Sequence, residues 1–111
     1  MMSRSRTTTD GAARRKRLAP IHPGEILSED LRDAGINLNQ LARCLRVPIN
    51  RISAIVSGKR SITAGTAMRL ARYFGTSPEY WMSLQIAYDL AIEERTTREQ
   101  VDREVLPRHA A

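Results

Sequence analysis

Residues 37–60, NLNQLARCLRVPINRISAIVSGKR, decide the fold of this chain. Asn37 can cap a first short helix that runs to about Leu45, because an asparagine side-chain oxygen accepts a hydrogen bond from a free backbone N–H. Pro48 can open a second short helix that ends at about Ser57. Small or apolar residues share one face of the first helix: Leu41, Ala42 and Leu45. The stretch therefore predicts two short helices joined by a tight turn.

The second helix has two different faces, since successive residues are rotated by about 100°. The apolar side holds Ile52, Ile55 and Val56, and the other side is small and polar, with Asn50, Ala54 and Ser57. Such a face can enter the major groove of DNA, where Asn50 can pair with adenine, Arg51 with guanine or a phosphate, and Ala54 can touch a thymine methyl. We therefore expect a helix-turn-helix that binds DNA.

Lys59 and Arg60 lie just beyond this helix, where a cation would meet the phosphate backbone and fix docking without contacting bases. The residues predicted to bind DNA come from the helix starts, the outer face and the following turn: Asn37, Gln40, Pro48, Asn50, Arg51, Ser53, Ala54, Ser57, Lys59 and Arg60.

The charge pattern favours the same interpretation. The chain of 111 residues has a formal net charge of +6, and no acidic residue lies between Asp33 and Glu79. That interval holds seven basic residues: Arg43, Arg46, Arg51, Lys59, Arg60, Arg69 and Arg72. From Glu79 to the end, acidic residues outnumber basic ones. A charge run alone is usually a solvated face, but here it coincides with the predicted helix-turn-helix, which favours DNA binding.

Residues 1–17 carry six basic side chains against Asp10 alone and show no apolar periodicity. We interpret residues 1–20 as a disordered, flexible basic arm. The arm either adds phosphate or minor-groove contacts or is a leader whose charge is incidental, and the sequence leaves both open.

Further helix signals surround the central stretch, and no segment alternates as a strand would. We predict helices over residues 23–34, from Thr63 to before Gly75, and from Ser77 to at least Ala91. With the two short helices, this gives an all-α fold of five helices. We assign the helix-turn-helix domain to residues 21–94 and an extension or tail, whose structure is left open, to residues 95–111.

All five aromatic residues fall within sixteen positions: Tyr73, Phe74, Tyr80, Trp81 and Tyr88. We expect Phe74 and Trp81 to be packed in a core, because no convergent polar groups suggest a ligand pocket. A homodimer is expected, since one short helix contacts few base pairs. The predicted dimer interface is on the last helix and consists of Tyr80, Trp81, Leu84, Tyr88 and Ala91.

The composition argues against an enzyme, a metal site or a cofactor. Cys44, His22 and His109 occur singly rather than at metal-ligand spacing, so we expect Cys44 to be a small packing residue and His22 a helix-entry residue. Glu25, Glu29 and Asp33 would form a solvated face or a protein-contact face on the first helix. No apolar run is long enough to span a membrane, the start does not look like a signal peptide, and one cysteine fits a reducing compartment, so we expect a cytoplasmic protein.

Five segments in order carry a family resemblance: HPGEIL (22–27), NQLA (39–42), ISAIVSGKR (52–60), ITA (62–64) and GTSPEYW (75–81). Over about residues 21–92 the chain resembles the HigA-type antitoxins, within the wider Xre/Cro-like group whose fold is that of the lambda repressor. The resemblance implies a dimeric repressor that binds its own operator and neutralises a partner toxin, typically a HigB-like mRNA endonuclease.

Two positions depart from the pattern of these relatives. Arg46 occupies the turn position where glycine is usual, and Leu38 stands where many relatives place a phosphate-binding glutamine, which leaves Gln40 as a substitute. Two other functions remain open: a free-standing repressor without a toxin, and a protein inhibitor whose acidic helices mask a basic toxin. A neighbouring gene for a small basic protein would favour the antitoxin.

Overall fold

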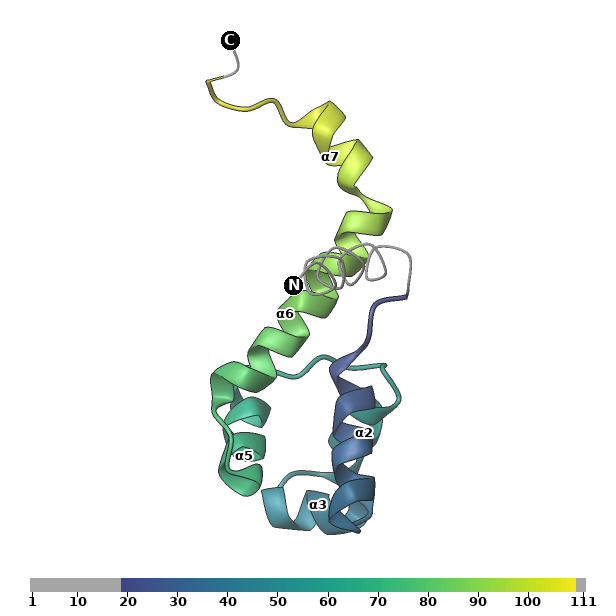
Figure 1. Ribbon diagram of the computed structural model, residues 1–111, viewed down its shortest axis with the longest axis vertical. Helices are drawn as coiled ribbons and strands as arrows, with labels where there is room; N and C mark the ends of the chain where they lie inside the picture. Colours follow the sequence, from purple (N-terminus) through teal and green to yellow (C-terminus); the bar gives the residue numbers. More distant parts are fainter. Residues whose placement is uncertain (1–18, 110–111) are drawn as a thin grey trace, which may run out of the picture.

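The computed structural model describes residues 19–109, which fold into six helices without a strand (Figure 1). The helices are α2 (Pro23–Ala34), α3 (Leu38–Leu45), α4 (Ile49–Val56), α5 (Ala64–Phe74), α6 (Pro78–Thr96) and α7 (Arg98–Glu104). The all-α prediction is confirmed, and α2 to α6 match the five predicted helices. The predicted arm, residues 1–20, lies almost entirely outside the described residues.

Local hydrogen bonds explain why the helices begin and end where they do. The side chains of Asn37, Thr63 and Ser77 each accept a backbone N–H three residues ahead, as predicted for N-caps. His22 caps α2 through Nδ1, which accepts from the backbone N–H of Gly24 at 2.9 Å. It is therefore the helix-entry residue that the sequence predicted.

One hydrophobic core lies between the helices. Its buried apolar members come from α2 to α6 and the loop before α5: Leu27, Leu31, Leu41, Ala42, Leu45, Ile52, Ile55, Ile62, Ala67, Leu70, Ala71 and Trp81. Trp81 is fully buried, and its Nε1 donates to Thr76 Oγ1 at 2.9 Å, so its one polar atom is satisfied. Phe74 is half-buried against this core. The predicted core role of both aromatic residues is confirmed.

Gly24 is where α2 and α4 come closest together. It is buried, and an added Cβ would collide with the carbonyl oxygen and carbon of Ile55 on α4. The α2–α4 contact therefore requires a residue without a side chain at this position.

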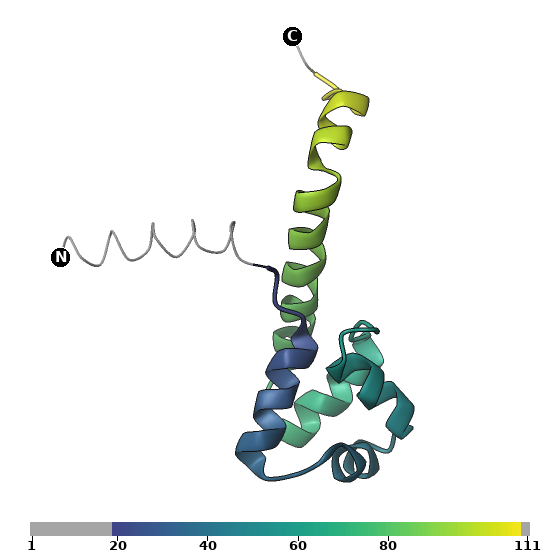
Figure 2. The same ribbon diagram turned by 90° about the vertical axis from the view of Figure 1, so that its right-hand side faces the viewer.

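The C-terminal part differs from the five-helix prediction. α6 is 19 residues long and continues to Thr96, past the domain end that we placed at residue 94. A short α7 then follows in the segment whose structure was left open, and none of its residues is buried. In Figures 1 and 2, α6 and α7 leave the bundle of α2 to α5 and extend away from it. None of the helices described, in residues 19–109, is long and apolar enough to cross a membrane.

Candidate nucleic-acid interface

α3 and α4 form the predicted helix-turn-helix. Ala42 is 4% exposed at the α3–α4 contact, and its carbonyl oxygen accepts from the Val47 N–H at 3.1 Å, which closes the turn. Arg46 sits in that turn with φ 61° and ψ 45°, in the left-handed region. Among the described residues it is the only non-glycine with positive φ. The turn therefore keeps the geometry expected of a glycine, at a cost of about 1 kcal/mol.

α4 presents the two faces that the sequence predicts. Ile52 and Ile55 are fully buried, and Val56 packs partly against the core. On the outer side Asn50, Ser53 and Ser57 are exposed, whereas Arg51 and Ala54 are half-buried. The helix thus offers a small polar ridge to a partner while its apolar side holds it on the bundle.

Asn37 and Gln40 have a structural role that limits how they can bind DNA. They form a reciprocal capping box: Asn37 Oδ1 accepts from the Gln40 N–H and Gln40 Oε1 accepts from the Asn37 N–H, both at 2.8 Å. Both side-chain oxygens are therefore occupied at the start of α3. The capping box uses no side-chain donor, so the amide NH2 groups of both residues can still donate to a phosphate.

The turn that carries Lys59 and Arg60 is held on the bundle by a residue that sequence reasoning missed. Gln85 of α6 is 3% exposed, and its Oε1 accepts from the backbone N–H of Ile62 at 2.8 Å. Its Nε2 donates to Asp89 Oδ1 at 2.9 Å. Gln85 thus ties the segment after α4 to α6, with Lys59 and Arg60 exposed at its start. A lone glutamine in a helix gave no hint of this contact across 23 positions.

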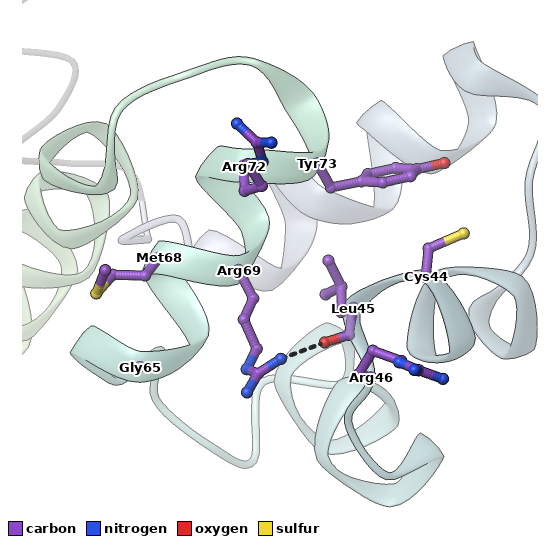
Figure 3. A pocket seen from close by; sticks show the side chains of 8 residues that line it. All are labelled: Cys44, Leu45, Arg46, Gly65, Met68, Arg69, Arg72 and Tyr73. Carbon is purple, nitrogen blue, oxygen red and sulfur yellow. Dashed lines mark hydrogen bonds between the residues drawn. The ribbon is translucent and has the colours of Figure 1, made fainter.

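A groove of about 820 Å³ runs between the end of α3 and α5 (Figure 3). Arg69 crosses it and donates from a guanidinium nitrogen to the Leu45 carbonyl oxygen at 3.0 Å. In Figure 3, Arg46 extends away from Arg69. Cys44 lines the groove and is exposed, so its expected packing role is wrong: the buried face of α3 is filled by neighbouring residues. Partial burial raises the pKa of the Tyr73 hydroxyl above its usual value. The electrostatic effect of Cys44 and a hydrogen bond with Cys44 raise this pKa further, by smaller amounts.

The acidic side chains of α2 lie close enough to affect one another. Glu25, Glu29 and Asp33 are exposed and Asp30 is half-buried. Burial raises the pKa of the Asp30 carboxyl, and the negative charges of Asp33 and Glu29 raise it further. α2 therefore carries a negatively charged surface, and a basic partner would reduce the repulsion between its carboxylates.

The predicted dimer residues differ in what they offer to a second subunit. Trp81 is wrong as a contact residue, because it is fully buried inside its own chain. Leu84, Tyr88 and Ala91 are half-buried, and Tyr88 packs edge-on against His22 with ring centroids 4.8 Å apart. Tyr80 is 40% exposed.

Two other α6 residues are more exposed than the predicted ones. Ile86 is 53% exposed and Leu90 is 63% exposed, one helical turn apart on the same side of α6. Sequence reasoning missed this pair, although its i, i+4 spacing could have indicated it.

Comparisons with known proteins agree with the fold and with the helix-turn-helix. A helix-turn-helix family profile matches residues 28–81. Virulence-associated protein I of Dichelobacter nodosus is 45% identical over 84 residues, covering 75% of this chain and 78% of that protein.

Two solved structures are also similar. The structure of an addiction module antidote protein of a HigA family from Coxiella burnetii is 49% identical, with 81% of this chain and 99% of that chain covered and a TM-score of 0.77. The Pseudomonas aeruginosa antitoxin HigA, solved with the higBA promoter, is 43% identical, with 79% and 97% covered and a TM-score of 0.76. These similarities reach nearly the full length of both structures. The chain belongs to the helix-turn-helix proteins and, within them, to the HigA antitoxin family.

Proposed function

We propose that this protein is a DNA-binding antitoxin that represses its own operon from the cytoplasm, with α4 in the major groove of the operator. The observation that carries the proposal is the exposed polar ridge of α4, with Asn50 and Ser57, inside a segment that has no acidic residue from 34 to 78. Positive potential and a protruding helix are the two features that duplex recognition needs. The HigA relative from P. aeruginosa was solved with a promoter, which supports a DNA target for this chain.

Binding to the DNA upstream of the gene tests the proposal. Fluorescence anisotropy would compare a labelled upstream duplex with a shuffled duplex of equal length and composition, at physiological ionic strength for the affinity ratio and at low ionic strength for the presence of any binding. We expect the upstream duplex to bind at least 1,000-fold more tightly, the lower end of the ratio between specific and non-specific sites. Absence of affinity for any duplex would refute DNA binding.

The repressor is proposed to be a homodimer that joins through α6, because Ile86 and Leu90 expose large apolar area there. Leu90→Asp is expected to convert the dimer to a monomer, since an unpaired charge would be buried in the seam. Sedimentation equilibrium measures the mass. Met68→Asp on α5 is the matched control, because Met68 is 64% exposed and lies outside α6. A dimer that survives Leu90→Asp would place the interface elsewhere.

The partner toxin is proposed to be a HigB-like mRNA endonuclease, and the acidic face of α2 is its proposed contact. Charge complementarity favours a basic partner for that face. We expect Glu29→Lys combined with Asp33→Lys to weaken toxin capture at least tenfold and to leave operator affinity undiminished. Co-purification with the product of the adjacent gene measures capture. Glu99→Lys on α7, where the carboxylate is also exposed, is the control.

Two results would redirect this part of the proposal. Unchanged capture by the α2 variant would remove α2 from the toxin contact. A gene neighbourhood without an open reading frame for a toxin would favour a free-standing repressor, which would bind DNA through the same residues.

A further inference from the structure

Two arginines of the helix-turn-helix have no charged or hydrogen-bonding partner among residues 19–109. Arg43 on α3 and Arg46 in the turn are both exposed. Within residues 19–109, neither side chain makes an ion pair or a hydrogen bond with another residue. With no acidic residue between Asp33 and Glu79, their charge is not neutralised by neighbours in the sequence.

The same two side chains line a groove of about 420 Å³ beside the turn. The other lining residues come from α3, the turn and the first turn of α4: Asn39, Ala42, Val47 and Ile49. Asn39 is exposed and stands one helical turn before Arg43, so its amide and the Arg43 guanidinium lie on one side of α3. Two guanidinium groups and one amide therefore border a small concave surface.

Arg46 adds an argument from the backbone. It holds the left-handed conformation that glycine adopts without a steric penalty. An arginine at this position costs stability and supplies a side chain that glycine would lack. A function for that side chain accounts for the residue, whereas packing does not, since the side chain is exposed.

The position of the groove indicates its ligand. Ile49, at its edge, is the first residue of α4 and precedes Asn50, the first side chain of the ridge proposed to contact bases. A helix in the major groove, about 12 Å wide, has a phosphate backbone on each side. The groove lies beside the N-terminal end of α4, and with α4 in the major groove, as proposed above, one of these backbones would pass this end.

We propose that Arg43, Arg46 and the Asn39 amide form a binding site for phosphate groups of the operator backbone beside the major groove. This site rests on the DNA binding proposed above and adds contacts at the turn. Guanidinium groups form paired, charge-assisted hydrogen bonds with phosphate oxygens. Such contacts strengthen binding to every duplex and do not distinguish sequences.

Arg46→Gly distinguishes phosphate binding from a role in folding, because the substitution should raise stability and lower DNA affinity. We expect a higher midpoint of thermal unfolding, since glycine relieves the backbone, together with weaker binding to both operator and shuffled DNA. The slope of log affinity against log salt should become shallower by about 0.9, the value for one phosphate contact. Between 50 and 200 mM salt, affinity would then fall about three- to fourfold less than for the unaltered protein. Arg43→Ala should give the same change in slope, and the double variant about twice that change.

Arg103→Ala on α7 is the control, because Arg103 is also an exposed arginine but lies far along the chain from the turn. It should leave the salt slope unchanged. If Arg46→Gly changes neither the salt slope nor the affinity, the phosphate site is overturned. If Asn50→Ala still reduces the preference for operator over shuffled DNA in that case, the proposed function stands without the phosphate site. A protein that binds no duplex at all would overturn both.

Discussion

Gly24→Ala is expected to destabilise the fold by about 3 kcal/mol or more, the upper end of the cost of overpacking. The added Cβ would meet the backbone carbonyl of Ile55, which cannot rotate away as a side chain can. α2 would have to move off α4, and Leu27 and Ile55, both fully buried, would lose their contacts. Since small domains are stable by only about 5–15 kcal/mol, the midpoint of thermal unfolding should fall steeply. Circular dichroism at 222 nm measures it.

Gly65→Ala is the matched control for this prediction. Gly65 lies near the start of α5, and an added Cβ there would meet no atom within 4 Å. We expect this variant to be about 0.4–1 kcal/mol more stable than the natural chain, because alanine restricts the unfolded state and favours the helix. Equal stability of the two variants would contradict the close α2–α4 contact.

Asn50→Ala combined with Arg51→Ala should remove much of the preference for operator over shuffled DNA. Each bidentate contact with a base edge is worth about 1–3 kcal/mol of discrimination, so losing two would cost about 2–6 kcal/mol. Both residues lie on α4 outside its buried face, and their truncation should leave the midpoint of thermal unfolding nearly unchanged. The ratio of the two dissociation constants at fixed salt measures the effect.

Lys59→Ala gives the comparison for this experiment. Lys59 is exposed just after α4, where a contact with the phosphate backbone would be independent of sequence. Its loss should weaken binding to both duplexes by the same factor. If the Asn50 and Arg51 variant behaves in this way too, α4 does not contact base edges.

Much of the fold could be predicted from the sequence because its helix ends are marked by local chemistry. Asn37, Thr63 and Ser77 each cap a helix through a bond to a nearby N–H, and Gly35 and Gly75 end α2 and α5 in the left-handed region. These interactions join residues at most four apart in the chain. The two faces of α4 follow equally from helical periodicity.

The features that could not be predicted depend on contacts between distant segments. Gly24 is constrained by α4, and Gln85 reaches the Ile62 N–H in a loop 23 positions earlier. Trp81 could have filled either a core or a subunit seam, since both bury aromatic area, and only the packing of α5 on α6 distinguishes them. Cys44 was misplaced for a similar reason: its helix buries Leu41, Ala42 and Leu45, and the thiol falls just outside that face.

The overhanging C-terminal helices have an electrical consequence. α3 to α5 carry seven basic residues and no acidic one, whereas the segment from α6 onward holds seven acidic residues and four basic ones. α6 and α7 point away from the bundle (Figure 2), so most of the C-terminal acidic residues lie at a distance from the basic residues of α3 to α5, while the acidic face of α2 stays within the bundle. The electric field of a polyanion such as DNA would therefore rotate the protein before the two molecules touch. The protein would arrive with the basic bundle leading and the acidic overhang trailing in solvent, where a second protein can reach it.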